Sequence, residues 1–256
     1  MKRLDGKVAI VTGGGDGIGR ASCLRLAQEG AAVVVAEIDE SSGTAVADEV
    51  GASGGFSQFV QTDVGSEESV RVMVAQVNRE FGKVDVLVNN AATFVLKGVD
   101  ATVDDWRNIL DVNVIGPALV TKHVVPHMRR AGKGAIVNLG SISSFIAQSE
   151  MLTYNATKGA IASMTRCMAL DLAADGIRVN AVCPGTVWTK IVQQLTGEAG
   201  LDRAAADRHP DWGGAHMLNR LADPSEIANA ILFLASDEAS FVTAECLMVD
   251  GGYIAK

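Results

Sequence analysis

Two side chains that could move a proton lie four residues apart in the second half of the chain. Tyr154 and Lys158 open a segment with helical apolar spacing, and residues four apart share one face of a helix. A phenol has an ordinary pKa of about 10 and exchanges protons poorly at neutral pH. A nearby ammonium favours the phenolate and lowers that pKa, so the pair predicts a general acid/base. The same spacing also suits two unrelated surface residues, and the rest of the chain decides between these interpretations.

A glycine-rich turn near the N-terminus predicts a site for a phosphate-bearing ligand. It joins a predicted strand to a predicted helix, and its spacing is Thr12-Gly13-x-x-x-Gly17-Ile18-Gly19. Glycine allows positive φ and lets the backbone approach a ligand closely. The N-terminus of the following helix offers free N–H groups to an anion such as a pyrophosphate. Between a strand and a helix, this motif predicts a dinucleotide site.

Two acidic residues indicate which dinucleotide the site prefers. Glu37 ends the second predicted strand, eighteen residues after Gly19, where a carboxylate hydrogen-bonds the adenosine ribose of NAD. Asp16 adds a second negative group in the turn, and no Arg or Lys adjoins Glu37. A 2′-phosphate would meet like charge at about 4 Å, which costs roughly 1 to 4 kcal/mol. NAD (NADH) is therefore the predicted cofactor, and an ordinary solvated strand end is the alternative interpretation of Glu37.

The elements that must position these residues alternate regularly along the chain. Short apolar runs rich in β-branched residues predict strands, and segments with helical spacing lie between them. Strands are expected at 8–11, 32–36, 56–60, 84–88, 135–139, 177–182 and 246–249, and helices at 21–29, 70–81, 161–174 and 227–234, among others. Continuous apolar strands are typical of a parallel sheet covered on both faces. We therefore expect one α/β domain over residues 1–256, with a doubly wound, Rossmann-type parallel seven-stranded sheet flanked by helices.

One long segment, 187–221, breaks the alternation of strands and helices. It is polar and contains Trp188, His209, Trp212 and His216. An excursion of this length inside a compact domain is usually functional and often forms an active-site lid. We interpret it as a substrate lid, with a variable surface insertion as the alternative.

Composition and charge exclude several classes of protein. The chain has 48% hydrophobic and 20% charged residues, as in ordinary soluble proteins, and a formal net charge of −8. That charge argues against nucleic acid or an anionic membrane as the main partner. The chain has no run of eighteen consecutive apolar residues, so no transmembrane helix is predicted. No long apolar core follows the charges at the N-terminus, so a cytoplasmic location is expected.

Cysteine and histidine spacing gives no sign of a disulfide framework or a metal site. The four cysteines are scattered, with no C-x-x-C pair, and are expected to be reduced thiols. His123 and His127 are four apart on a predicted helix, but no third ligand is placed near them. No metal is therefore predicted.

Taken together, the motifs resemble those of the classical short-chain dehydrogenases/reductases. The resemblance extends from Leu4 to the closing Asp250-Gly251-Gly252. Its motifs, in order, are Thr12-Gly13-x-x-x-Gly17-Ile18-Gly19, Asp63, Asn89-Asn90-Ala91, Asn113, Ser141, Tyr154-x-x-x-Lys158 and Pro184-Gly185. One departure is Ala92, where the family usually has glycine after Asn-Asn-Ala; we expect binding to survive so small a change.

The resemblance implies the following roles. Tyr154 would be the general acid/base, Lys158 would lower its pKa, Ser141 would orient the carbonyl oxygen, and Asn113 would hold a water that relays protons. In the cofactor site, Asp63 and Val64 would hold the adenine, and Asn90 would pack against the adenosine half. The segment Pro184-Gly185-Thr186-Val187-x-Thr189 would fix the carboxamide. The full predicted cofactor set is Gly13, Asp16, Gly17, Ile18, Gly19, Glu37, Asp63, Val64, Asn90, Tyr154, Lys158, Pro184, Gly185, Val187 and Thr189.

The resulting hypothesis is an NAD-dependent enzyme that interconverts a secondary alcohol and a ketone by hydride transfer. Its small-molecule substrate would contact parts of the lid and the side chains of Phe94, Ser143, Gln148, Met151 and Trp188. The substrate itself is not identified, because this fold supports many chemistries. Similarity to the family further implies a homotetramer, paired through helices around 104–130 and 154–174 and through the last strand. Small residues suit such close packing: Ala160, Ala162, Ser163, Ala169 and Ala173.

Two competing functions are weighed against this hypothesis. The first is an NADPH-dependent 3-oxoacyl thioester reductase, for which Arg129 and Arg130 could face an acidic carrier protein. Glu37, Asp16 and Met151 argue against it. The second is a dinucleotide-sensing protein without catalysis, which would not need to keep Ser141, Tyr154 and Lys158 together.

Overall fold

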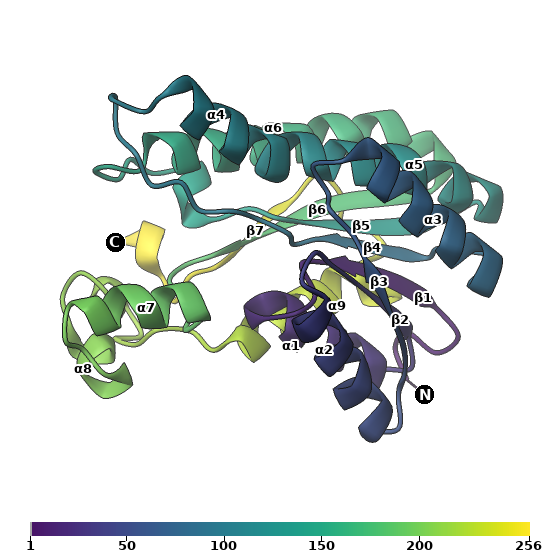
Figure 1. The fold of residues 1–256 in the computed structure, drawn as a ribbon, viewed down its shortest axis with the longest axis horizontal. Coiled ribbons are helices and arrows are strands. Elements are labelled where there is room, and N and C mark those ends of the chain that lie inside the picture. Colours follow the sequence, from purple (N-terminus) through teal and green to yellow (C-terminus); the bar gives the residue numbers. More distant parts are fainter. Residues whose placement is uncertain (1) are drawn as a thin grey trace.

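The computed structural model describes residues 2–256 and has a seven-stranded parallel sheet at its centre (Figure 1). The strands lie in the order β3-β2-β1-β4-β5-β6-β7, and every neighbouring pair is parallel. Their bounds are β1 (Val8–Thr12), β2 (Ala32–Glu37), β3 (Phe56–Gln61), β4 (Val86–Asn89), β5 (Gly134–Leu139), β6 (Ile177–Pro184) and β7 (Cys246–Val249). The predicted fold class is confirmed, with strand order reversing between β1 and β4.

Burial explains why these runs became strands. Every residue of β1 and β4 is buried, which requires helices on both faces of the sheet. Two apolar clusters fill those two faces, one containing Val11, Val33 and Val88 and the other Ile10 and Leu87. Alternate residues of one strand therefore belong to opposite clusters, as the period of two of a strand dictates.

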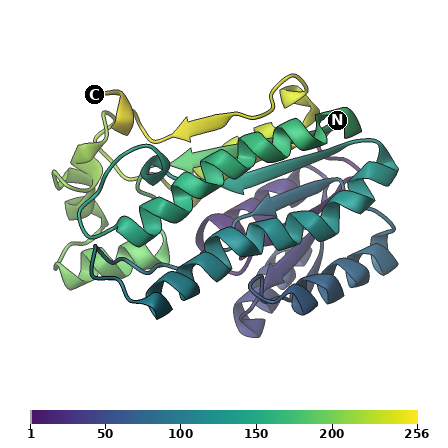
Figure 2. The ribbon, with the colours of Figure 1, turned by 90° about the horizontal axis from the view of Figure 1, so that it is seen from above.

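Nine α-helices lie among the described residues. Their bounds are α1 (Gly17–Gln28), α2 (Glu40–Ala52), α3 (Glu67–Phe81), α4 (Val103–Leu110), α5 (Gly116–Ala131), α6 (Leu152–Leu172), α7 (Lys190–Glu198), α8 (Arg203–Arg208) and α9 (Pro224–Ala235). One layer contains α1, α2 and α9, and the other contains α3, α4, α5 and α6 (Figures 1 and 2). No helix among residues 2–256 is both long and apolar enough to cross a membrane.

The helix expected around 104–130 is interrupted by a different kind of turn. A π-helical segment, η1 (Asp111–Ile115), joins α4 to α5. Such one-turn π-segments widen a helix and are frequent at functional sites. The predicted site residue Asn113 lies within η1 and is buried.

The helix α6 changes one expectation about assembly. It packs on β6, and Ala162 and Ala169 face the chain's own interior, with 4% and 2% of their surface exposed. These two residues therefore cannot form the proposed contact between subunits. Ser163 is exposed on the same helix and Ala173 is exposed just after its end, so both remain available to a partner.

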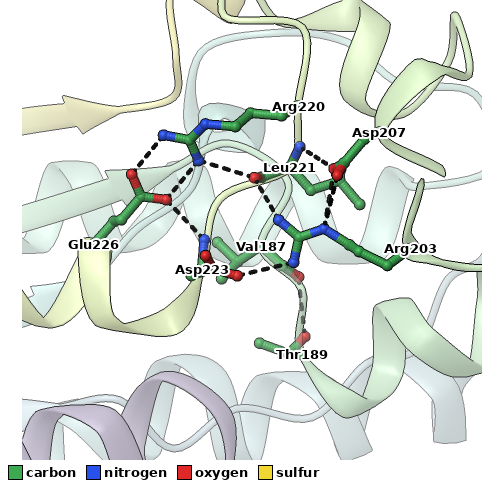
Figure 3. A network of polar contacts seen from close by, with 8 residues as sticks. All are labelled: Val187, Thr189, Arg203, Asp207, Arg220, Leu221, Asp223 and Glu226. Atoms are coloured by element: carbon green, nitrogen blue, oxygen red, sulfur yellow. Dashed lines mark hydrogen bonds and ion pairs between the residues drawn. The ribbon is translucent and has the colours of Figure 1, made fainter. Parts of the chain in front are cut away.

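The excursion at 187–221 folds into α7, α8 and a short 3-10 turn, η4 (Gly213–Ala215). Its two ends meet, because Val187 forms a parallel bridge with Ala222. Arg203 fastens this base through hydrogen bonds to Asp223 Oδ1 at 2.9 Å and the Leu221 carbonyl at 3.0 Å (Figure 3). The segment is thus a folded unit with a tethered base rather than a loose loop.

The turn after β1 allows a test of packing at a single glycine. A Cβ added at Gly19 would lie 1.9 Å from the carbonyl oxygen of Gly13, so the turn and α1 cannot both keep their positions. We expect Gly19→Ala to lower the free energy of unfolding by roughly 1 to 3 kcal/mol, measured by urea denaturation. Gly51→Ala is the matched control, because Gly51 is helical with nothing within 4 Å of its added Cβ. In Gly51→Ala the free energy of unfolding is expected to rise by about 0.5 to 1 kcal/mol. Equal losses of this free energy in both variants would contradict this account.

Candidate active site

A cavity of about 1090 Å³ opens at the carboxyl ends of the strands. Gly13 follows β1 and Asn90 follows β4, and both line the cavity. The cavity thus lies where strand order reverses, the usual ligand crevice of doubly wound sheets. Most of the predicted cofactor residues line it: Gly13, Asp16, Gly17, Ile18, Glu37, Asp63, Val64, Asn90, Tyr154, Lys158, Pro184, Gly185, Val187 and Thr189.

The glycine turn is shaped for a ligand that approaches the backbone. Gly13 and Gly17 have φ of +62° and +52°, which side chains rarely adopt. Asp16 caps α1 by accepting a hydrogen bond from Gly17 N, and the helix N-terminus adds its partial positive charge. Gly19 does not line the cavity but lets α1 pack against the Gly13 carbonyl. These residues fit the pyrophosphate of a dinucleotide.

Glu37 is held in a fixed orientation at the edge of the cavity. Its Oε2 accepts from Gly15 N at 3.1 Å, and its Oε1 accepts from Ile38 N at 2.8 Å and Asp39 N at 3.2 Å. Three backbone donors thus hold the carboxylate beside the glycine turn. An oriented carboxylate suits ribose hydroxyls and opposes a phosphate at the same place.

Ser141, Tyr154 and Lys158 converge at the opposite end of the cavity. Ser141 follows β5, and its hydroxyl is close enough to Tyr154 to act on the pKa of the phenol. Lys158 donates to the Leu139 carbonyl at 2.8 Å, and its Nζ lies 5.5 Å from the centre of the Tyr154 ring. All three side chains are buried, with 9%, 9% and 4% of their surfaces exposed. The structure therefore brings the predicted acid/base residues together.

Burial sets the protonation of this site. It raises the pKa of Tyr154 to about 12, while the hydrogen bond with Ser141 acts in the opposite direction. It lowers the pKa of Lys158 to about 8. In the chain without a bound cofactor, desolvation outweighs the hydrogen bond with Ser141, so the pKa of Tyr154 lies above its ordinary value rather than below it. At neutral pH the residues are a neutral phenol and a largely protonated amine.

Asn113 acts on Tyr154 through a chain of contacts. Its Oδ1 accepts from Thr93 N at 2.8 Å, and its Nδ2 donates to the Thr93 carbonyl at 3.0 Å. The next residue, Phe94, stacks on the Tyr154 ring at 5.1 Å between centroids. Asn113 itself does not line the cavity. Its side chain thus anchors the segment that supports the tyrosine, and the predicted water relay stays a prediction.

Four of the five predicted substrate residues line the cavity: Phe94, Ser143, Gln148 and Met151. Trp188 does not. The chain is extended at the 187–222 bridge, so successive side chains point to opposite sides. Val187 faces the cavity, whereas Trp188 lines a separate hollow against α1 and packs under Arg203. For this reason the structure does not bring Trp188 together with the other four predicted substrate residues.

Two aromatic residues outside the five named substrate residues complete the cavity wall, and Tyr253 also lies outside the predicted lid. Trp212 comes from the excursion, and Tyr253 comes from the C-terminal turn η6 (Tyr253–Ala255). The helix α7 adds apolar side chains from Ile191, Val192 and Leu195. The helical spacing of these three apolar residues, at positions i, i+1 and i+4, could have indicated the contribution of α7. Nothing in the local sequence marks Tyr253.

The remaining metal-ligand candidates are engaged elsewhere. His123 Nε2 lies 3.0 Å from Glu67 Oε1, and His127 Nδ1 lies 2.7 Å from an Arg130 nitrogen. Within residues 2–256 no group of three or more His, Cys, Asp or Glu side chains is arranged to hold a metal ion.

The sheet order and the glycine cradle define a Rossmann-type α/β protein. A family model described as enoyl-(acyl carrier protein) reductase matches residues 13–254. Cis-4-hydroxycyclohexanecarboxylate dehydrogenase of Sinomonas cyclohexanicum is 42% identical over 97% of each chain, and cyclopentanol dehydrogenase of Comamonas testosteroni is 40% identical over 100% of each. A solved short-chain type dehydrogenase/reductase from Mycobacterium marinum superposes with a TM-score of 0.91 at 32% identity, covering 99% of this chain and 97% of that one. The chain belongs to the short-chain dehydrogenase/reductase family of oxidoreductases.

The buried lysine makes stability depend on pH in a defined direction. Its pKa falls from 10.5 to about 8 on folding, so the unfolded chain binds more protons between these values and stability rises there with pH. Burial of the ammonium lowers the unfolding free energy by its full amount below pH 8, and this loss shrinks as the pH rises toward 10.5. We expect the unfolding free energy of the wild type, relative to that of Lys158→Met, to rise by roughly 1 to 2 kcal/mol between pH 7 and pH 9.5. Urea denaturation at each pH measures it. A difference that stays constant over this range would contradict burial of the ammonium.

Proposed function

We propose that the protein is an NAD-dependent dehydrogenase that interconverts a secondary alcohol and a ketone. The observation that carries the proposal is the convergence of Ser141, Tyr154 and Lys158 on a cavity whose far end is the glycine cradle. One continuous cavity can thus present the alcohol carbon to the nicotinamide while the tyrosine hydroxyl faces the reacting oxygen. The relatives named as alcohol dehydrogenases support this activity.

The chain's own residues would handle the proton and the oxygen. When bound, NAD supplies the hydride acceptor for oxidation, and NADH supplies the donor for reduction. Ser141 would hydrogen-bond the substrate oxygen and orient it, and Tyr154 would remove the hydroxyl proton or return it. The Lys158 ammonium, fixed by the Leu139 carbonyl, would favour the phenolate as the proton moves. The positive charge of the oxidised nicotinamide would act in the same direction and offset the effect of burial.

The wall around the reacting centre favours a small, uncharged, cyclic or branched alcohol. Phe94, Trp212 and Tyr253 supply flat apolar surface, and Ser143 and Gln148 supply polar groups that already bond each other at 2.5 Å. The carboxylates among the lining residues at this end belong to Glu150 and Asp211, which disfavour an anionic substrate. The uncharged cyclic alcohol in the name of cyclopentanol dehydrogenase agrees with such a wall, whereas the relative named for cis-4-hydroxycyclohexanecarboxylate acts on a cyclic alcohol that carries a carboxylate.

Cofactor choice separates this proposal from an NADPH-dependent thioester reductase. We expect initial rates to favour NAD over NADP by at least tenfold, since a 2′-phosphate would meet Glu37 at roughly 1 to 4 kcal/mol. Glu37→Gln keeps the size of the side chain and removes its charge, so the preference should narrow by about tenfold. Glu40→Gln, an exposed change at the start of α2, is the control and should leave the ratio unchanged. A tenfold preference for NADPH in the wild type would favour the reductase instead.

Removal of a single hydroxyl tests whether the site is catalytic. Tyr154→Phe keeps the ring that stacks on Phe94 and removes the group proposed to carry the proton. We expect turnover of a panel that includes cyclopentanol and cyclohexanol to fall by about 10² to 10⁴, while the NADH dissociation constant stays within about threefold. Ser163→Ala removes an exposed hydroxyl from the same helix, outside the cavity lining, and serves as the control. Unchanged turnover in Tyr154→Phe would sink the mechanism, and a wild type that binds NADH but oxidises no alcohol would point to a dinucleotide sensor.

A further inference from the structure

A buried histidine lies between the cofactor segment and the substrate wall. His216 directly follows the η4 turn and exposes only 3% of its surface. Its Nε2 accepts a hydrogen bond from Thr186 N at 3.1 Å, and its Nδ1 lies 3.0 Å from the Trp212 carbonyl oxygen. Thr186 and Trp212 both line the cavity, on separate segments of the chain.

The partners fix how the ring must be protonated. A backbone N–H can only donate and a carbonyl can only accept. His216 is therefore an acceptor at Nε2 and a donor at Nδ1, which is the neutral Nδ1–H form of the imidazole. Each ring nitrogen has one partner of the correct polarity, and neither bond can be reversed without loss.

Packing around the ring brings a third segment into the same contact. The His216 ring meets the Tyr253 ring edge-on, with centroids 5.2 Å apart. A Cβ at Gly185 would lie 2.7 Å from His216 Nε2, and a Cβ at Gly251 would lie 3.4 Å from His216 Cβ. The absence of side chains at these two glycines thus makes room for the imidazole between β6 and the C-terminal turn.

We propose that His216 is a positioning residue that sets the distance between the 184–187 segment and the wall formed by Trp212 and Tyr253. The inference rests on the proposed function, in which that segment faces the nicotinamide and that wall faces the alcohol. One hydrogen bond of the imidazole holds the cofactor side. The other bond and the ring contact hold the substrate side, so cofactor and alcohol are brought into register through a single rigid ring.

Two substitutions separate the two hydrogen bonds. His216→Gln places an amide oxygen near the Nε2 position and keeps an acceptor for Thr186 N. His216→Asn places an amide N–H near the Nδ1 position and keeps a donor for the Trp212 carbonyl. NADH binding is measured by fluorescence titration, and KM and kcat are measured with cyclopentanol at saturating NAD. His123→Gln and His123→Asn, on α5 and outside the cavity lining, are the matched controls.

Each variant should weaken the binding of a different ligand. For His216→Asn we expect the NADH dissociation constant to rise by roughly tenfold, since Thr186 N–H loses its buried acceptor, with KM for the alcohol within about threefold. For His216→Gln we expect the reverse, a KM for the alcohol raised by roughly tenfold and NADH binding within about threefold. Thermal unfolding is recorded for all variants, because a purely structural role would lower stability without this split.

The outcomes distinguish this role from the proposed function. Suppose that the wild type is active and that both His216 variants change the NADH dissociation constant and the KM for the alcohol in the same way, or change neither. That result would overturn the role of His216 alone. Failure of both variants to fold while the His123 controls fold would make His216 a stability residue and overturn it as well. A wild type that neither binds NADH nor oxidises any alcohol of the panel would overturn the proposed function, and this role with it.

Discussion

The site depends on one constraint, which is the close contact between the carboxyl ends of β1 and β4, where the strand order of the sheet reverses. Asn90 holds this contact, because its Nδ2 donates to the carbonyls of Thr12 and Gly13, each at 2.9 Å. Thr12 Oγ1 in turn accepts from the backbone N–H groups of Asn90 and Ala91. The bonds satisfy polar groups that the end of a buried sheet would otherwise leave unpaired. They also keep the glycine turn open as a cradle.

The same contact explains why a small residue is tolerated after Asn90. Position 91 lies against Gly13, where a Cβ on the glycine would be 2.8 Å from Ala91 Cα. The close approach therefore requires glycine on the β1 side, at position 13. Ala92 is exposed and lines the cavity beyond that contact. The departure from the family pattern is thus consistent with an intact cradle.

Sequence patterns predicted the elements well and the cavity wall less well, for physical reasons. A strand buried on both faces is visible as a continuous apolar run, and all seven strands begin within two residues of their expected starts. The wall depends on which side of a chain faces inward, and that is decided by tertiary contacts. The bridge of Val187 with Ala222 turned Trp188 outward, and no local spacing announces a bridge. Tyr253 reaches the cavity only because the C-terminal turn packs on His216.

The π-turn and the excursion show how such contacts convert an ordinary sheet into a shaped site. The π-turn places Asn113 where it can fasten the chain at Thr93, beneath the aromatic pair that supports the reacting hydroxyl. The excursion gains its rigidity at its base, where Arg203 binds Asp207 and Asp223 and Arg220 binds Glu226 (Figure 3). Paired charges of this kind add little stability when exposed, but a network fixes geometry. Because the base is fixed, we expect a small change within 190–212 to alter the substrate wall while the cradle and the acid/base residues keep their places.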